Sequence, residues 1–289
     1  MTETQLVGPI VLFVLMVIVG LELTPADFQR VVRAPAAVVG GTLAQLALLP
    51  LMTWGVVVLT DVPPVFGAGA VLVAAAPGAG ISNILVAIAR ANTALSVTLT
   101  AVASVLSVIT LPVVSALGIR VFLGDRVEVD VPVGVLTLQL AFALLLPIAL
   151  GMLLRARRPD LAHRYAPRIQ RWALAAIAAL IILAALFSDE GVEVGIEDVG
   201  IGFLAAGLWT VSAMAIGWGV ASLLRLSAVD RFTFLVEFSA RNVAVATIVA
   251  LSGLDRLDLT LFSGLYFAVG YPLAGVAVLW WRRRHPGER

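Results

Sequence analysis

The sequence predicts an all-α polytopic membrane protein with about nine transmembrane helices in two inverted-topology repeats. Of its 289 residues, 61% are apolar and only 13% are charged, whereas a soluble domain is nearer half apolar and a quarter charged. The mean hydropathy is +1.06. Two apolar runs are also interrupted by polar residues at matching positions, and this third observation predicts the repeats.

Apolar runs of about 17–25 residues, the length that crosses a bilayer core, recur along the whole chain. The predicted spans are Leu6–Leu23, Ala34–Thr60, Val65–Ala91, Thr93–Gly118, Val131–Leu154, Arg168–Phe187, Val199–Leu224, Ala228–Ser252 and Leu259–Trp281. The first follows the segment MTETQLVGP, which carries an acid and no base, so we interpret it as a span and not as a cleaved signal peptide. A very short turn, Arg90–Asn92, separates the third span from the fourth.

The arginines predict the orientation. The chain has no lysine, and fifteen arginines lie in the odd-numbered connections and the C-terminal tail, against three in the even-numbered ones. The positive-inside rule then places the N-terminus outside and the C-terminus in the cytoplasm. We expect the membrane to be the plasma (inner) membrane. The acidic connection Asp189–Asp198 falls outside, and Arg241 lies within a span.

The third and eighth spans are both interrupted. The third contains APGAGISN, where Pro77 lacks an N–H, two glycines permit unwound backbone, and Ser82 and Asn83 follow. The eighth contains VEFSARN, with Glu237 and Arg241 amid apolar residues. Charged groups at such depth cost a few kcal/mol each, so we expect them to pair or to face a polar cavity.

These two spans are five apart, so they cross the membrane in opposite directions. Interrupted spans at matching places in oppositely oriented halves are typical of inverted-repeat transporters. We therefore expect one transporter domain over residues 1–289, with a first repeat of four spans in 1–124. The second repeat, 131–289, has five spans and includes the fifth span as an extra element.

The interruption in the third span predicts half of an ion site. A break leaves backbone carbonyls and amides without helical partners, which is tolerated in a membrane only against a polar cavity. Ser96 and Thr100, at i and i+4, place two hydroxyls on one face of the fourth span. Hydroxyl, amide, carbonyl and carboxylate oxygens around one point suit a hard cation.

At these residues the sequence resembles the bile acid:sodium symporter family. The resemblance covers essentially the whole chain and is carried by GLELTPADF (20–28), QLALLP (45–50), PGAGISN (77–83), NTALSVTLTAVASVLSVITLP (92–112) and VEFSARN (236–242), in this order and spacing. It implies a panel domain and a core domain, with two broken helices crossing at mid-membrane. It also implies sodium-coupled symport of a small organic anion, such as a carboxylate, a sulfonate or a bile acid.

The resemblance also implies the site residues. One sodium site is expected at Ser82, Asn83, Ser96, Thr100 and Glu237. A second cation site is expected at Gln45, Phe238, Ala240 and Arg241, and the substrate is expected beside Asn242, Arg241 and Gly80.

The sequence departs from the family pattern at three places. It lacks the first helix of ten-span members, it has PGA where PGG is usual, and it has Arg241 where a Gln is expected. A guanidinium is permanently charged and cannot ligate sodium, which speaks against a second sodium. Three roles stay open for Arg241: a fixed substitute for the second cation, a binding group for an anionic substrate, or a structural partner of Glu237.

An alternative on the same scaffold is a proton-coupled or uncoupled anion carrier, with Glu237 as the proton site. An enzyme is not expected, because no span contains a histidine to serve as a base and the chain has no G-x-x-x-x-G-K-[ST] motif. The expected partners are sodium, a small organic anion and the lipid bilayer; neither nucleic acid nor a protein partner is indicated.

Overall fold

The computed structural model describes residues 3–124, 133–160 and 195–285, together with positions 172, 175 and 179. The elements it describes are helices, and no strand occurs among these residues. Five helical stretches are long and apolar enough to cross a membrane: Pro35–Thr60, Thr93–Leu123, Val133–Arg157, Glu197–Leu223 and Asp258–Arg284. The chain is therefore an all-helical integral membrane protein.

In the first half, the helices are α1 (Glu3–Glu22), α2 (Pro25–Arg33), α3 (Pro35–Thr60), α4 (Pro64–Ala75), α5 (Gly80–Ala89) and α6 (Thr93–Leu123). In the second half, α7 (Val133–Leu140) continues through the π-helical turn η2 (Ala141–Leu145) into α8 (Leu146–Arg157). After the gap come α10 (Ile196–Leu223), α11 (Ala228–Ser239), α12 (Val243–Ile248) with its π-helical extension η3 (Val249–Gly253), the short 3₁₀ turn η4 (Asp258–Thr260) and α13 (Leu261–Arg284).

Eight of the nine predicted spans coincide with described helices. The sixth, Arg168–Phe187, lies outside the described residues, so the count of nine stays a prediction. The predicted end of the fourth span at Gly118 was wrong, since α6 runs on to Leu123. Gly118 lies within the helix, and Val71 of α4 packs directly against it, so the missing side chain permits close packing of α6 on α4.

Two helix starts have side-chain caps. Asp27 Oδ2 accepts from the backbone N of Thr24 at 2.8 Å and from its hydroxyl at 2.6 Å, at the start of α2. Asn92, in the short turn before α6, accepts from the backbone N of Leu95 at 3.1 Å. Each side chain supplies an acceptor to donors at the helix start, which have no partner within the helix.

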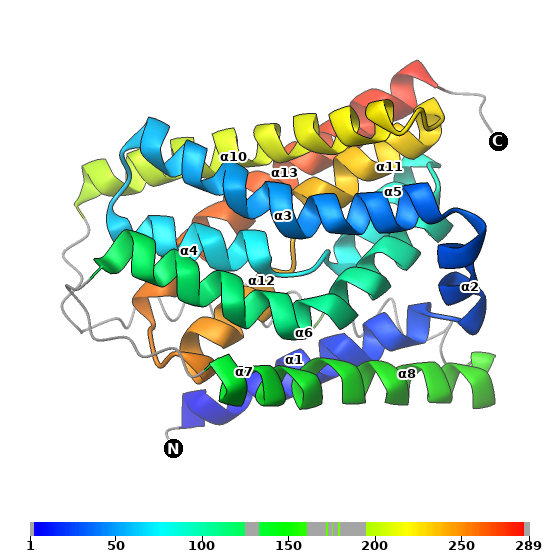
Figure 1. Cartoon of the computed structure of the whole chain (residues 1–289), viewed down its shortest axis with the longest axis horizontal. Coiled ribbons are helices and arrows are strands. Elements are labelled where there is room, and N and C mark those ends of the chain that lie inside the picture. The colour runs from blue at the N-terminus through cyan, green and yellow to red at the C-terminus, as the bar shows by residue number, and fades with distance from the viewer. Residues whose placement is uncertain are drawn as a thin grey trace.

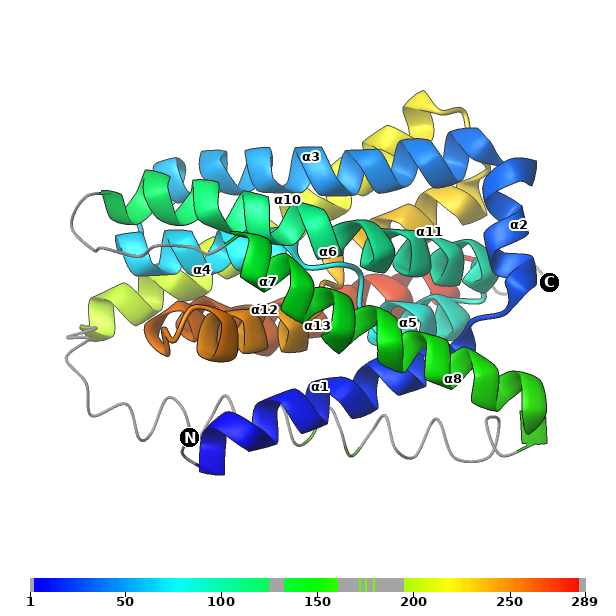
Figure 2. The same cartoon turned by 60° about the horizontal axis from the view of Figure 1, so that its bottom comes forward.

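The helices form two groups. The helix α1 and the continuous α7–α8 segment lie together along one side of the molecule, and the remaining long helices pack beside them (Figures 1 and 2). The two groups meet in two places: α12 and η3 contact α1, and α6 contacts α7 and η2. Within the smaller group, α1 and α8 approach closely at Gly20 and Gly151, where a Cβ on either residue would overlap the backbone of the other helix.

The described arginine-rich connections gather at one end of the molecule. The helix α2, the end of α8, the turn between α10 and α11 and the end of α13 all lie on the right in Figure 1. The turn between α3 and α4 and the start of α10 lie at the opposite end. This placement agrees with the alternation that the arginine count predicts.

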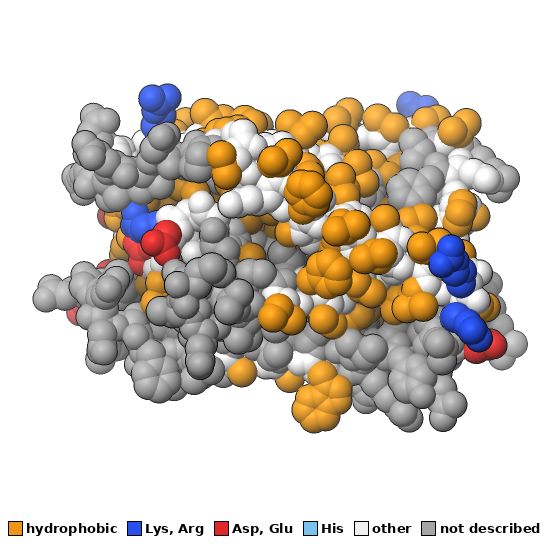
Figure 3. Space-filling view, turned by 90° about the horizontal axis from the view of Figure 1, so that it is seen from below, with side chains coloured by type: hydrophobic (Ala, Val, Ile, Leu, Met, Phe, Trp, Pro, Cys, Tyr) orange, Lys and Arg blue, Asp and Glu red, His pale blue; other side chains and the backbone are white. Residues whose placement is uncertain are grey.

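The surface is apolar and the interior holds charge. Leu51, Phe142 and Leu204 are each more than 60% exposed, whereas Glu237 and Arg241 are completely buried. Seen from below, hydrophobic side chains cover much of the described face, and arginines lie toward its ends (Figure 3). This is the reverse of a soluble protein, in which charged side chains are almost never fully buried, and it fits a lipid environment around the helices.

Candidate cation and substrate site

The two predicted interruptions are real breaks, and they lie against each other. Residues 76–79 separate α4 from α5, and residues 240–242 separate α11 from α12. The extended segments run antiparallel: Ala79 N donates to Ala240 O at 3.0 Å, and Asn242 N donates to Pro77 O at 2.9 Å. Backbone groups freed by each break are thus partly satisfied by the other break.

Local sequence explains both breaks. Ala76 precedes Pro77 and is extended, with φ −62° and ψ 149°, because proline disfavours helical geometry in the residue before it. The second break contains no proline. Hydrogen bonds from two tyrosines of α13 to its backbone stabilise it instead. Tyr266 Oη donates to Ser239 O and accepts from Arg241 N, and Tyr271 Oη donates to Arg241 O at 2.7 Å.

Three hydroxyls surround the carboxylate of Glu237. Thr100 Oγ1 lies 2.5 Å from Oε1, while Ser82 Oγ and Ser96 Oγ each lie 2.7 Å from Oε2. The amide oxygen of Asn83 completes the group, 2.9 Å from Ser96 Oγ. The five residues predicted for the first sodium site therefore come together at one place, and all are buried.

Gly78 makes room for this cluster. A Cβ at Gly78 would overlap Glu237 Oε1 and lie 3.0 Å from Thr100 Oγ1. The glycine is needed here for its lack of a side chain, since its φ is not in the left-handed region. The first break thus serves the site by bringing bare backbone against the carboxylate.

Arg241 forms a second cluster with Gln45. Its Nη1 donates to Gln45 Oε1 at 2.6 Å, and its Nη2 donates to Ala76 O at the end of α4. No ion pair within 4 Å joins Arg241 to Glu237, although the structure describes both residues. Arg241 Nε and Gln45 Nε2 are buried with no hydrogen-bond partner among the described residues.

The two other residues predicted for the second site play different parts. The Phe238 side chain is buried and stacks on Phe234, with ring centroids 5.7 Å apart. The carbonyl of Ala240 accepts from Ala79 N in the crossing, the place where the extended segments 76–79 and 240–242 pair. Of the four residues, only Gln45 and Arg241 therefore bring their side chains into direct contact.

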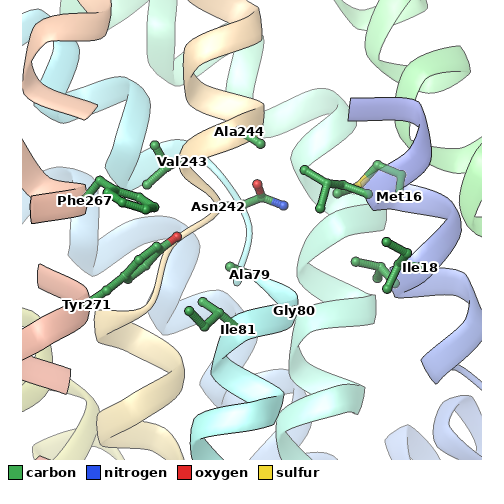
Figure 4. Close-up of a pocket in the computed structure, with 12 residues that line it drawn as sticks. Met16, Ile18, Ala79, Gly80, Ile81, Asn242, Val243, Ala244, Phe267 and Tyr271 are labelled. Atoms are coloured by element: carbon green, nitrogen blue, oxygen red, sulfur yellow. The ribbon is translucent and has the colours of Figure 1, made fainter. Parts of the chain in front are cut away.

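A pocket lies between the crossing and α1. It is lined by residues 79–81 and 242–244 of the two breaks, by Phe267 and Tyr271 of α13, and by Leu15, Met16, Ile18 and Val19 of α1. Figure 4 shows the amide of Asn242 pointing from the crossing toward Met16 and Ile18. Two of the predicted substrate residues, Gly80 and Asn242, line this pocket, whereas Arg241 does not.

Sequence reasoning missed the α1 wall and the two tyrosines of α13. The α1 residues are ordinary apolar residues in an apolar run, so nothing in their type distinguishes a pocket wall from a lipid-facing surface. Tyr266 and Tyr271 carry a usable signal: the chain has only three tyrosines, and a hydroxyl deep in a span needs a polar partner.

The chain matches a known family over more than half of its length. The sequence pattern of the sodium bile acid symporter family matches residues 9–193. The chain belongs to this family. The match ends before the second break, which contains Glu237 and Arg241.

Relatives cover nearly the whole chain. The chain is 28% identical to the probable sodium/metabolite cotransporter BASS1 of Arabidopsis thaliana over 93% of its length, and 25% identical to the sodium-dependent transporter YocS of Bacillus subtilis over 94%. It is 26% identical to the mouse sodium/bile acid cotransporter 4 over 87%. The chain spans 65% of the plant protein, 82% of the bacterial one and 58% of the mouse one.

Proposed function

We propose that the protein is a secondary active transporter that couples the entry of sodium to symport of a small organic anion. Sodium-dependent relatives support the coupling ion. The observation that carries the proposal is the hydrogen count at Glu237. Three hydroxyls make five close oxygen–oxygen contacts there, with Ala79 O, Asn83 Oδ1 and the two carboxylate oxygens.

A hydroxyl has a single hydrogen to donate, so three hydrogens cannot fill five contacts. Protonation of Glu237 adds one hydrogen and still leaves one contact unfilled. Converging oxygen atoms with too few hydrogens between them form a set of ligands for a hard cation. This count favours sodium over the proton-coupled alternative, in which Glu237 alone would carry the coupling ion.

For Arg241 we favour the role of a fixed substitute for a second cation. Its guanidinium lies between Gln45 Oε1 and the Ala76 carbonyl, two neutral oxygens that suit a cation. Arg241 is not among the residues that line the pocket, and no ion pair within 4 Å joins its guanidinium to Glu237. A substrate-binding or simple ion-pair role has no such contact in its favour.

The substrate is proposed to bind in the pocket beside α1. Asn242 Oδ1 accepts from Val245 N at 3.2 Å, so its amide nitrogen is the group left to donate to an anionic ligand. The rest of the lining is mostly apolar, which suits a carboxylate or sulfonate with an apolar body. Alternating access would then follow from movement of the α1 and α7–α8 group, the proposed panel, against the proposed core that holds the crossing.

Thermal unfolding of the purified protein tests the ion site. Sodium chloride, exchanged against choline chloride at constant ionic strength, should raise the melting temperature of the wild type. Glu237→Gln and Thr100→Val should each shift the half-saturating sodium concentration upward at least tenfold, because each removes an oxygen ligand. Screening organic anions in the same assay, with and without sodium, would identify the substrate.

Ser104→Ala is the matched control. Ser104 is buried one turn further along α6, and its hydroxyl donates to the helix backbone at Thr100 O, 2.7 Å away. Its loss should leave the sodium response unchanged. A wild type that sodium does not stabilise, or variants that respond like the wild type, would contradict the proposed site.

A further inference from the structure

A carboxylate outside the five-residue cluster holds one of its members. Glu22 is the last residue of α1, and its Oε2 accepts from Asn83 Nδ2 at 2.8 Å. Glu22 is half-buried and lies in the GLELTPADF stretch, to which the proposed transport mechanism assigns no other part. It is a polar link from α1 to the proposed sodium site.

The end of α1 that carries Glu22 is itself fixed. Arg155 of α8 donates from Nη1 to Leu21 O at 2.9 Å and to Glu22 O at 2.8 Å. These carbonyls are at the helix C-terminus, where they lack partners within the helix and where a cation is favoured. The Glu22 carboxylate is therefore presented from a clamped helix end and not from a free loop.

An ionised carboxylate only accepts hydrogen bonds, whereas an amide has a donating end and an accepting end. Because Glu22 faces Asn83, the amide nitrogen must turn toward Glu22. The amide oxygen must then turn the opposite way, toward Ser96 Oγ at 2.9 Å and the Glu237 cluster. Reversing the amide would bring two acceptors together at Glu22 and place an NH₂ group among the cation ligands.

We propose that Glu22 is a positioning residue of the sodium site: by accepting from Asn83 Nδ2, it aims the Asn83 carbonyl oxygen at the ion and ties α1 to the occupied site. The inference rests on the proposed function and adds a residue to it. Groups that orient metal ligands typically contribute 10–100-fold to metal affinity. Glu22 has this relation to Asn83.

The link also connects the ion to the pocket. One face of α1 carries Glu22 at its end and, along its length, the pocket-lining residues Leu15, Met16, Ile18 and Val19. The chain of contacts Glu237–Ser96–Asn83–Glu22 therefore runs from the proposed ion site to the wall of the proposed substrate site. Sodium that binds the Asn83 oxygen strengthens the arrangement in which α1 is held against the crossing. Since coupling is reciprocal, a ligand that holds α1 in place should in turn favour sodium.

The test compares two neutral replacements of similar length in the sodium-dependent thermal unfolding assay. Glu22→Met removes the acceptor and should raise the half-saturating sodium concentration at least tenfold. Glu22→Gln also removes the charge but keeps an amide oxygen that can accept from Asn83 Nδ2, so its value should stay within about threefold of the wild type. Glu197→Met, at an exposed acidic residue in the first turn of α10, is the control and should behave like the wild type.

The readout is the sodium concentration at half-effect, so a general loss of stability, which lowers the melting temperature at every sodium concentration, is separated from a loss of affinity. If Glu22→Met is not obtained folded, Glu22→Ala removes the acceptor without adding bulk and replaces it in the comparison. A wild-type response with an unchanged Met or Ala variant would overturn this inference and leave the proposed function standing. Equal losses in the Gln and Met variants would overturn it as well, because charge and not orientation would then be responsible. A wild type that does not respond to sodium would overturn both.

Discussion

Arg241 is the residue at which this chain differs most consequentially from the pattern of its family. Its guanidinium donates to Gln45 Oε1 and Ala76 O, two oxygens that a sodium ion could otherwise bind. A permanent charge at this place does not cross the membrane with the substrate. We therefore expect the wild type to bind one sodium per cycle and to transport a monoanion without net charge movement.

Arg241→Gln tests this stoichiometry. The substitution should restore a side-chain oxygen and admit a second sodium, so the Hill coefficient for sodium-dependent stabilisation should rise from about one toward two. Uptake in proteoliposomes should become voltage-sensitive, because moving one charge across the membrane is worth about 2.3 kcal/mol per 100 mV. A wild-type Hill coefficient near two would contradict the proposal that the Arg241 guanidinium takes the place of a second sodium ion. Weaker substrate binding with an unchanged coefficient would instead assign Arg241 to the substrate.

Residue types predicted the oxygen-bearing residues of the proposed sodium site better than they predicted the residues that hold these in place. Ser82, Asn83, Ser96, Thr100 and Glu237 stand out because polar groups in an apolar span need a reason to be there. That they bind sodium stays a prediction, but the structure does bring them together. The Glu22 contact was not predicted, because Glu22 lies at the end of a predicted span, away from the two interrupted segments. Its partner is 61 residues away in the chain.

The two broken helices show what a local pattern can and cannot predict. Pro77 and its neighbouring glycines predict that a helix ends, and VEFSARN predicts the second interruption through its charges. Neither pattern states that the two segments pair with each other, as Ala79 with Ala240 and Asn242 with Pro77 do. That contact depends on the packing of α4, α11 and α13, which the sequence of either break alone does not encode.

Gly78→Ala tests whether the close approach at the first break matters. The added Cβ would overlap Glu237 Oε1, and overpacking of this kind typically costs about 1–3 kcal/mol. We expect a lower melting temperature and a weaker sodium response.

Gly275→Ala, within α13, is the matched control. Its Cβ would lie in open space with no neighbouring atom within 4 Å. It should be neutral or slightly stabilising, since alanine favours a helix by about 1 kcal/mol over glycine. Equal behaviour of the two variants would contradict a role for the bare backbone at Gly78.

At the scale of the whole molecule, composition and the arginine count predicted more than residue patterns did. The apolar runs located eight of nine predicted spans on described helices, because length and hydropathy constrain a helix in lipid directly. Where the structure describes them, the odd-numbered connections lie at one end of the molecule (Figure 1), as the alternation requires. The grouping of α1 with α7–α8 was not predicted: the family resemblance implied a panel and a core without saying which spans form each. It depends on which helix faces fit each other, as at Gly20 and Gly151.

The orientation in the membrane can be tested directly, because the chain contains no cysteine. Gly195 precedes α10, and Ala228 begins α11 just after the turn that ends α10. Both are exposed.

The helix α10 is long enough to place these two positions on opposite sides of the membrane. Its 28 residues rise about 42 Å at 1.5 Å per residue, more than the roughly 30 Å hydrocarbon core. The arginines Arg225 and Arg231 flank the second position, and positive charge is retained in the cytoplasm. A membrane-impermeant maleimide added to intact cells should therefore label Gly195→Cys, and should label Ala228→Cys only after permeabilisation. Labelling of both in intact cells would show that α10 does not span the membrane. Labelling of Ala228→Cys alone would reverse the orientation and place the Glu22 end of α1 outside.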